Sequence, residues 1–278
     1  MNAPEARHLA VAIFAAFVSF ISARGQNAPS LKVLISGGFR AAYEELVPEF
    51  ERQTGHTIVT AYGGSMGNAP NAIPNRLQRG EPADVVILAS SGFEGLVKQH
   101  KVIPGSRVDL ARSIIAMAVR AGAQKPDIST LEGFKRTLLA AKSIAYSDST
   151  SGVYLSTELF QRPGIADAIR SKCMRIDVGM VGTVIARGEA EIGFQQLSEL
   201  LPIAGIDIVG PIPSEAQKMT VYSGGVAVHS EQPAIAKQFL RFLASPEAAA
   251  TIKKSGMEPV SEQLTTSGNS RSETTAHE

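Results

Sequence analysis

The chain lacks several features that would assign it to common classes of protein. Its 278 residues include no Trp and a single cysteine, Cys173, so no disulfide can form within the chain. Lys and Arg total 27 against 26 Asp and Glu, which leaves a formal net charge of +1 with no basic cluster. Proteins that bind nucleic acid present a positive stripe to the phosphates. The sequence therefore predicts no nucleic-acid partner.

Metal-binding spacings are also missing. The cysteine and the 5 histidines form neither a CxxC pair nor an HExxH motif, which are spacings that zinc sites use. We therefore expect no metal and no cofactor. We expect Cys173 to be a small core residue rather than a reactive thiol.

One long apolar run is present, at the N-terminus, and no second one follows it. Arg7 precedes the apolar stretch 9–21, and small residues come next. This order is typical of a secretory signal peptide. The stretch is shorter than the roughly 20 residues of a membrane span, although Ile21 near the cut leaves an uncleaved anchor as the alternative. We expect residues 1–23 to be a signal peptide, a mature chain from about Arg24, and a periplasmic protein.

Short apolar runs alternate with helical patterns along the rest of the chain. Residues 41–53 place apolar side chains at helical spacing, and Gly55 closes that pattern. Strands that alternate with helices predict an α/β fold with mainly parallel sheets flanked by helices. The stretch 261–278 is rich in Ser, Thr and Glu and predicts a disordered tail. Strands are expected at 32–35, 57–62, 84–89, 113–119, 143–146, 174–177, 192–195, 207–209 and 220–228, and the last helices at 232–243 and from Pro246.

Small residues gather at four turns that each follow a predicted strand and precede a helical stretch. Ligands of open α/β sheets bind at the carboxyl ends of strands. Glycine lets the backbone approach a ligand, hydroxyl groups donate hydrogen bonds, and helix N-termini attract anions. Each turn alone could be only a turn, since Gly and Ser are common there, but four together predict an anion site. The turns are 36–39, 63–66, 147–152 and 178–180.

From Leu31 to about Pro259 the chain resembles the type II periplasmic binding proteins, and most closely their molybdate-binding branch. The resemblance implies two α/β lobes that close over a ligand and are joined by two crossing strands. It implies a monomer that hands a small anion to the membrane permease of an ABC-type importer, and not an enzyme. The residues that carry it are GGS at 63–65, PADVVILAS at 82–90, GEAEIGFQQLSEL at 188–200 and FLASPEAAATIKKSG at 242–256.

The resemblance also implies lobe limits and ligand contacts. Lobe I is expected at 30–111 plus 226–260 and lobe II at 112–225, with crossings near Arg112–Ser113 and Tyr222–Gly225. The pair Gly224–Gly225 would suit a hinge. The implied ligand-binding residues are Gly38 and Phe39 in the first turn, Gly64 and Ser65 in the second, Ser151 and Gly152 in the third, Val178 and Gly179 in the fourth, and Gln196 after a later strand.

Two of these positions depart from the molybdate pattern. Gly38 supplies no hydroxyl group, and Gln196 stands where the family has a tyrosine. Two arginines lie close by in sequence, Arg40 after the first turn and Arg112 at a crossing. An arginine in the cleft would suit a carboxylate, which it can bind with two parallel hydrogen bonds. We expect Arg112 to be the better candidate. The ligand is thus predicted to be a small carboxylate or a molybdate-like oxyanion.

A secreted α/β serine hydrolase is the alternative from another class. GGSMG around Ser65 satisfies the G-x-S-x-G pattern of a nucleophile elbow, and Asp207 and His229 follow in a suitable order. Pro70 and Pro74 argue against it, because they interrupt the helix that should continue directly from the elbow.

Overall fold

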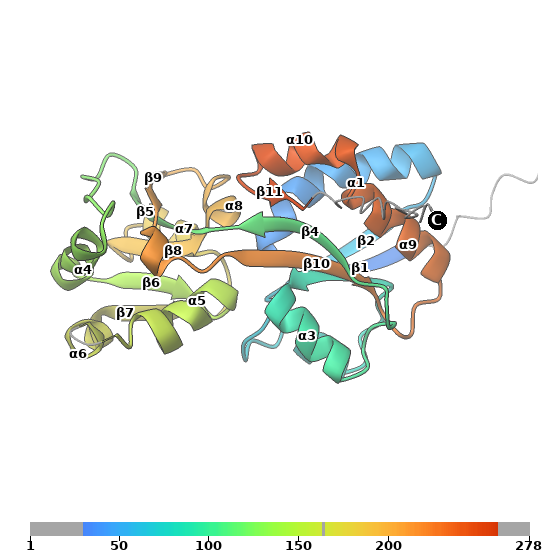
Figure 1. The fold of residues 1–278 in the computed structure, drawn as a ribbon, viewed down its shortest axis with the longest axis horizontal. Helices are drawn as coiled ribbons and strands as arrows, with labels where there is room; N and C mark the ends of the chain where they lie inside the picture. The colour runs from blue at the N-terminus through green and yellow to red at the C-terminus, as the bar shows by residue number, and fades with distance from the viewer. Residues whose placement is uncertain (1–29, 163–164, 261–278) are drawn as a thin grey trace, which may run out of the picture.

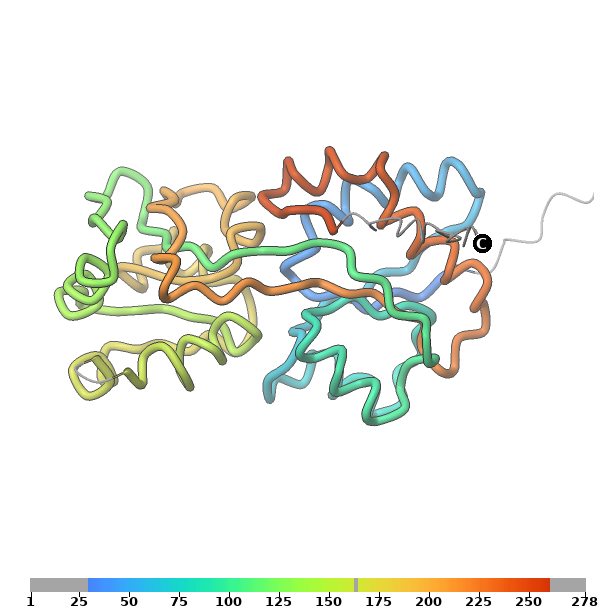
Figure 2. Tube along the Cα trace, viewed as in Figure 1, coloured from blue at the N-terminus to red at the C-terminus, as the bar shows by residue number. Residues whose placement is uncertain are grey.

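The computed structural model describes residues 30–162 and 165–260. The signal peptide predicted at 1–23, its cleavage near Arg24 and the tail predicted at 261–278 lie outside these residues. The described chain forms two α/β lobes, each built on one sheet, and two long segments run between them (Figures 1 and 2). The predicted two-lobed α/β fold is confirmed.

The first sheet has the strand order β11-β4-β10-β3-β1-β2, in which β2, β1 and β3 are parallel and the others antiparallel. The second has the order β7-β6-β8-β5-β9, with β7, β6 and β8 parallel. In each sheet the parallel strands are those that alternate with helices along the chain. The antiparallel strands belong to the two crossings or lie next to them. The first sheet contains β1 (Leu31–Ser36), β2 (Ile58–Gly63), β3 (Val85–Ala89), β4 (Val108–Ser113), β10 (Thr220–Val226) and β11 (Glu258–Pro259); the second contains β5 (Ile115–Arg120), β6 (Ile144–Ser147), β7 (Cys173–Ile176), β8 (Ile192–Gln196) and β9 (Ile206–Pro211).

Helices cover both faces of each sheet. The α-helices are α1 (Arg40–Thr54), α2 (Ile73–Gln78), α3 (Ser90–Lys98), α4 (Leu131–Ala140), α5 (Thr150–Tyr154), α6 (Ala166–Ile169), α7 (Val181–Ala186), α8 (Leu197–Leu200), α9 (Pro233–Leu243) and α10 (Pro246–Lys254). Shorter turns are the 3-10 segments η1 (Gly37–Phe39), η3 (Arg170–Lys172) and η4 (Ser214–Ala216) and the π-helix η2 (Leu155–Leu159).

Local sequence signals account for the ends of several helices. α1 ends at Gly55, which takes the left-handed conformation at φ 73° that favours glycine. The Ser245 hydroxyl caps α10 by accepting a hydrogen bond from Ala248 N at 3.4 Å, and Pro246 occupies its first turn. These signals let the amphipathic stretches begin and stop where their apolar faces meet the sheet.

Aromatic side chains on α1 and α9 pack over one face of the first sheet. Phe50 lies edge-on to Phe239, with ring centroids 4.8 Å apart, and both are buried. Burying a side chain of this size contributes about 1.5–3 kcal/mol. The opposite face is covered by α2 and α3, where Phe93 is fully buried. In the second lobe Cys173 is half-buried against the core, and burial raises the pKa of its thiol.

The predicted strand at 113–119 corresponds to β5, and β4, which comes directly before it, was not predicted. β4 ends at Ser113 in the first sheet and β5 begins at Ile115 in the second, so the first crossing occurs at Ile114. The second crossing lies between Pro211 and Thr220, because β10 already pairs with β3 and β4 of the first sheet. The residues predicted as the second crossing, Tyr222–Gly225, therefore lie within β10 in the first lobe, and the crossing itself comes earlier in the chain.

The glycine pair predicted to act as a hinge has a packing role instead. A Cβ atom at Gly224 would overlap the side chain of Leu240 in α9, and one at Gly225 would meet the ring of Phe93 in α3 at 2.5 Å. β10 is thus pressed between helices on both faces, and glycine is needed because no side chain fits there.

Candidate functional site

A cavity of about 210 Å³ lies between the lobes, where the carboxyl ends of parallel strands from both sheets meet. This is the position at which open α/β sheets bind ligands. The first lobe contributes the turns after β1 and β2, and the second contributes the turns after β6, β7 and β8. The walls are formed by Gly37, Arg40, Tyr62, Gly63, Gly64, Met66, Ala69, Asn71, Ser147, Asp148, Ser149, Ile176, Asp177, Val178, Gly179, Met180, Gln195 and Glu199.

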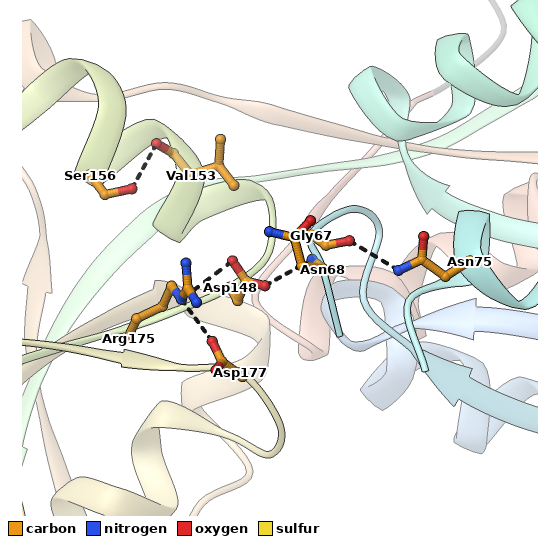
Figure 3. A network of polar contacts seen from close by, with 8 residues as sticks. All are labelled: Gly67, Asn68, Asn75, Asp148, Val153, Ser156, Arg175 and Asp177. Carbon is orange, nitrogen blue, oxygen red and sulfur yellow. Dashed lines mark hydrogen bonds and ion pairs between the residues drawn. The ribbon is translucent and has the colours of Figure 1, made fainter. Parts of the chain in front are cut away.

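Two loops from opposite lobes meet beside the cavity. Ser65 N donates to Ser149 Oγ at 3.2 Å, and Asn68 N donates to Asp148 Oδ2 at 3.0 Å. Figure 3 shows Asp148 between this loop and Arg175, which also binds Asp177. The loop turns at Gly67, whose φ of 101° is a left-handed value and whose α-carbon packs against the backbone of Asp148. The lobes are therefore in direct hydrogen-bonded contact across the cleft.

The cavity wall in the first lobe includes one arginine, Arg40, which begins α1. Its Nε donates to Glu44 Oε1 at 2.8 Å, and its guanidinium carbon lies 4.3 Å from the centre of the Tyr62 ring. The hydroxyl of Tyr62 donates to the same carboxyl oxygen at 2.7 Å. Stacking and the Nε bond fix the plane of the guanidinium, and the structure records no other hydrogen bond of Arg40 within the described residues. Its two terminal nitrogens remain available to an anion.

The wall in the second lobe includes a carboxyl group of different character, that of Glu199 in α8. Burial raises its pKa to about 7, while hydrogen bonds from Gln195 and the Gln196 backbone oppose that shift. The side chain faces the cavity and lies against the first turn, where its Oε1 occupies the space that a Cβ at Gly37 would need. It is therefore a carboxyl group that exchanges a proton near neutral pH.

The first turn is shaped by a second close approach. The Tyr222 side chain, from β10, reaches the α-carbon of Gly38, and a Cβ there would overlap its hydroxyl oxygen. Ser198 Oγ donates to the carbonyl oxygen of Gly38 at 2.7 Å. Burial and the neighbouring Glu199 raise the pKa of Tyr222, so that the phenol stays protonated. A hydroxyl group thus lies at the first turn even though Gly38 carries none.

Two buried hydroxyl groups at strand ends have no hydrogen-bond partner among the described residues. These are Ser36 Oγ at the end of β1 and Ser147 Oγ at the end of β6, and Ser147 lines the cavity. Buried polar groups are nearly always paired. The placement of Ser147 in the cavity wall indicates that the cleft can bind a polar ligand.

The structure places some of the predicted ligand-binding residues at the cavity and others away from it. Gly64, Val178 and Gly179 line the cavity, and Val178 is 66% exposed. Gly38 lies behind the wall at Gly37, and Phe39 is fully buried in the first core. Ser151 and Gly152 belong to α5 rather than to a turn, and Ser151 lines a separate cavity of about 270 Å³.

The other predicted contacts are engaged within the protein. Ser65 is buried, and its Oγ accepts from Ala89 N at 2.9 Å, which orders the entry to α3. Gln196 is buried and donates through Nε2 to Thr220 Oγ1 at 2.9 Å. Arg112 lies within the first sheet, paired with Val221 and Glu258, and does not line the cavity. Arg40, the less favoured arginine, is the one that does.

The hydrolase alternative is not supported by the structure. Ser65 Oγ is occupied by the Ala89 amide, His229 is exposed in the first lobe, and Asp207 accepts from Gly122 N in the second. α2 begins only at Ile73, several residues after the GGSMG turn. These side chains cannot form a triad, because they belong to separate parts of the fold.

Neither a metal-binding cluster nor a membrane-crossing helix is found in the described part of the chain. Within 30–162 and 165–260, no group of three or more His, Cys, Asp or Glu side chains is placed to hold a metal ion. In the same ranges no helix combines the length and apolar character of a membrane-crossing segment.

Comparison with known proteins assigns the family. The model of the bacterial extracellular solute-binding protein family matches residues 31–258, and the chain belongs to this family. It is 23% identical over 244 residues to a molybdate-binding protein of Azotobacter vinelandii, covering 83% of this chain and 90% of that protein. The solved structure of the periplasmic molybdate-binding protein of that organism superposes with a TM-score of 0.67 at 25% identity, covering 82% of this chain and 98% of that one.

A further relative corrects one expectation. The chain is 51% identical over 238 residues to a protein of Pseudomonas sp. named aconitate isomerase, covering 86% of this chain and 91% of that protein. The expectation that the chain is not an enzyme is therefore wrong. The binding-protein pattern of a sequence does not exclude catalysis, because one scaffold can carry different functions through a few side chains of its site.

The residue pattern did not point to several site residues, among them Tyr62, Asp148, Asp177, Glu199 and Tyr222. Asp148 lies in a turn that the sequence marks by its small residues. A charged side chain at that position could have been predicted to take part in the site. Glu199 follows β8 in QQLSEL, where it reads as an ordinary helical glutamate. Only the packing of α8 against η1 brings Glu199 to the cleft.

Proposed function

We propose that this protein is an isomerase of a small unsaturated polycarboxylate, with aconitate as substrate, and that it works in the cleft between its two lobes. The relative named aconitate isomerase, at 51% identity, supports this substrate and this reaction. The observation that carries the proposal is that the cavity wall combines a cation, Arg40, with an acid–base group, Glu199.

The size of the cavity supports a small metabolite. Its volume of about 210 Å³ is below the roughly 300 Å³ at which pockets for drug-sized ligands begin. Aconitate is a six-carbon chain with three carboxyl groups, and it is compact and strongly anionic. A ligand of this kind fills a small polar space and leaves little room for water.

The polar groups of the cavity support a carboxylate over a tetrahedral oxyanion. The terminal nitrogens of Arg40 form the planar fork that a carboxylate accepts in two parallel hydrogen bonds. Ser147 Oγ and Ser149 Oγ supply neutral hydroxyl donors from the opposite lobe. The acidic side chains Asp148 and Asp177 share Arg175, which offsets their repulsion of an anion.

The experiment is an isomerisation assay on the purified protein. We expect conversion between trans-aconitate and cis-aconitate, followed by proton NMR from either side of the equilibrium. Molybdate should neither inhibit the conversion at concentrations near the KM for aconitate nor raise the melting temperature. Saturable molybdate binding without any conversion of aconitate would contradict the proposal.

Ligand capture for an importer is the second candidate, favoured by family membership and by the inter-lobe hydrogen bonds that bind the two lobes together. The partner would be the permease of an ABC-type importer. The same assay separates the two functions. A protein that binds aconitate with high affinity but releases it unchanged serves capture, whereas repeated turnover by substoichiometric protein shows catalysis.

A further inference from the structure

Among the carboxyl groups that line the cavity, Glu199 alone lacks a basic partner in the described part of the chain. Asp148 and Asp177 both form ion pairs with Arg175, at 3.7 and 2.7 Å. No Lys or Arg of the described residues lies within ion-pair distance of Glu199, and its hydrogen-bond partners are the neutral Gln195 and the Gln196 backbone. An ion-paired carboxylate is a weak base because the cation stabilises its charge. Glu199 is free of that stabilisation.

We propose that Glu199 is the catalytic residue that takes a proton from one carbon of the bound polycarboxylate and returns it to another. This inference rests on the proposed function and adds the group that performs it. Glu199 faces the cavity, and it also lines a smaller cavity next to it together with Gly37, Arg40 and Met180. Its carboxyl oxygen lies against the backbone of Gly37, which holds the side chain on the side of the first turn.

The reaction balances with one proton and no other reactant. In aconitate a methylene carbon adjoins the double bond. Glu199 as carboxylate removes a hydrogen from this carbon, the electron pair of the C–H bond forms the new double bond, and the old double bond shifts its electrons toward its far carbon. The protonated Glu199 then delivers the proton to that far carbon, which becomes the new methylene group. The geometry of the new double bond depends on the rotation of the chain when the proton leaves.

The surroundings of Glu199 suit both halves of this step. A general base works best when its pKa lies near the working pH, and burial raises the pKa of Glu199 to about 7. Arg40 lines the same cavity and can hold a carboxylate whose negative charge grows as the proton leaves. The Tyr222 phenol, which burial keeps protonated, lies near Glu199 and cannot compete as a base at neutral pH.

The charged and titratable groups that face Glu199 set the pH dependence. They are Arg40 and Glu44 from α1, Tyr222 from β10, and Asp148 and Asp177 across the cavity. Burial raises the pKa of Glu199 itself to about 7. We expect kcat/KM to rise with pH and level off above about 7, as Glu199 of the free protein ionises. An anionic substrate opposes that ionisation, so kcat should level off at a higher pH.

The test compares two variants of Glu199 with a matched surface variant. Glu199→Gln keeps the shape and the hydrogen bonds but cannot accept a proton, and we expect kcat for trans-aconitate to fall about 100-fold or more. Its KM should stay within roughly threefold, because the substrate is held by other groups. Glu199→Asp keeps a base and should retain measurable turnover, with a shifted pH profile. Glu189→Gln, an exposed glutamate paired with Arg187, should match the unmodified protein.

Deuterium supplies a second readout. In D₂O the unmodified protein should place deuterium in the methylene group of aconitate. In some turnovers the proton held by Glu199 exchanges with solvent before it is returned to carbon. Glu199→Gln should abolish this exchange together with the isomerisation. A Glu199→Gln variant that keeps kcat within roughly threefold and still exchanges would overturn the role of Glu199 while the proposed function stands. An unmodified protein that neither isomerises nor exchanges aconitate would overturn both.

Discussion

The hydroxyl oxygen of Tyr222 occupies the space that a Cβ atom at position 38 would need. The family pattern expects a hydroxyl-bearing side chain at that position, and here a phenol from β10 delivers a hydroxyl from the other side. A side chain at position 38 and the Tyr222 ring in its present place cannot be present together, because they would overlap. Tyr222 therefore requires glycine at this position of the first turn.

Gly38→Ala should accordingly destabilise the protein by about 1–3 kcal/mol, the usual cost of forcing a carbon into a filled core. Urea unfolding measures the change. Gly95→Ala in the middle of α3 is the control, since a Cβ there meets nothing within 4 Å, and it should be neutral or stabilise by up to about 1 kcal/mol. Equal unfolding midpoints for the two variants would show that Tyr222 moves aside freely.

Arg40 should govern affinity for carboxylates. Arg40→Lys keeps the charge but loses the planar fork, and binding of trans-aconitate should weaken by about 1.5–3 kcal/mol, which is roughly 10- to 100-fold in Kd. Arg52→Lys, on the exposed side of the same helix and paired with Glu49, is the control. Calorimetry should find Kd unchanged in the control. An unaltered Kd in Arg40→Lys would mean that the ligand is held elsewhere.

Asp148 should couple ligand binding to lobe closure. Its carboxylate accepts from Asn68 N at 3.0 Å across the cleft, and a hydrogen bond to a charged group contributes about 1.5–3 kcal/mol. In Asp148→Ala we expect the closed form to lose this support, with weaker aconitate binding and less compaction in X-ray scattering. Asp167→Ala, whose exposed side chain pairs with Arg170, should compact like the unmodified protein. Full compaction in both variants would show that lobe closure does not depend on the contact between Asp148 and Asn68.

Ser65 should matter for stability rather than for catalysis. Its Oγ accepts from Ala89 N at 2.9 Å in a buried environment, and leaving a buried amide unpaired costs about 1–3 kcal/mol. Ser65→Ala should lower the melting temperature and keep its kcat for aconitate. Ser91→Ala, at an exposed position of α3, is the control and should change neither. If Ser65→Ala instead lost kcat and kept its melting temperature, Ser65 would have a role in catalysis.

Glu199 should make the protein less stable as pH rises. Its pKa is raised from 4.5 to about 7 by burial, so between these values the folded state holds more protons than the unfolded state. Stability therefore falls as pH increases through this window and levels off above it, by at most about 3 kcal/mol. Glu199→Gln removes this dependence. Melting temperatures of both proteins from pH 4 to pH 8 should diverge with rising pH, and parallel curves would show that Glu199 ionises as it does in water.

The residue pattern was sufficient to predict an α/β fold with mainly parallel sheets, because strands that alternate with helices allow few arrangements, and the family resemblance added the two lobes. The residue pattern located all four turns that border the cleft, 36–39, 63–66, 147–152 and 178–180, since ligand sites of such folds lie after strands. The resemblance placed the first crossing within two residues of Ile114, where the chain passes from one sheet to the other, but it placed the second too late in the chain, because only strand pairing shows that β10 belongs to the first sheet.

Side-chain roles were decided by tertiary structure. Sequence spacing favoured Arg112 over Arg40, but Arg112 lies between β10 and β11 while Arg40 opens on the cavity. Nothing in QQLSEL distinguishes Glu199 from a surface glutamate; its raised pKa arises because α8 packs against the first turn and excludes water. Patterns of apolar residues determine which elements form and which faces are buried. The charge and proton affinity of a side chain depend instead on neighbours that are distant in sequence, and only the folded chain brings them together.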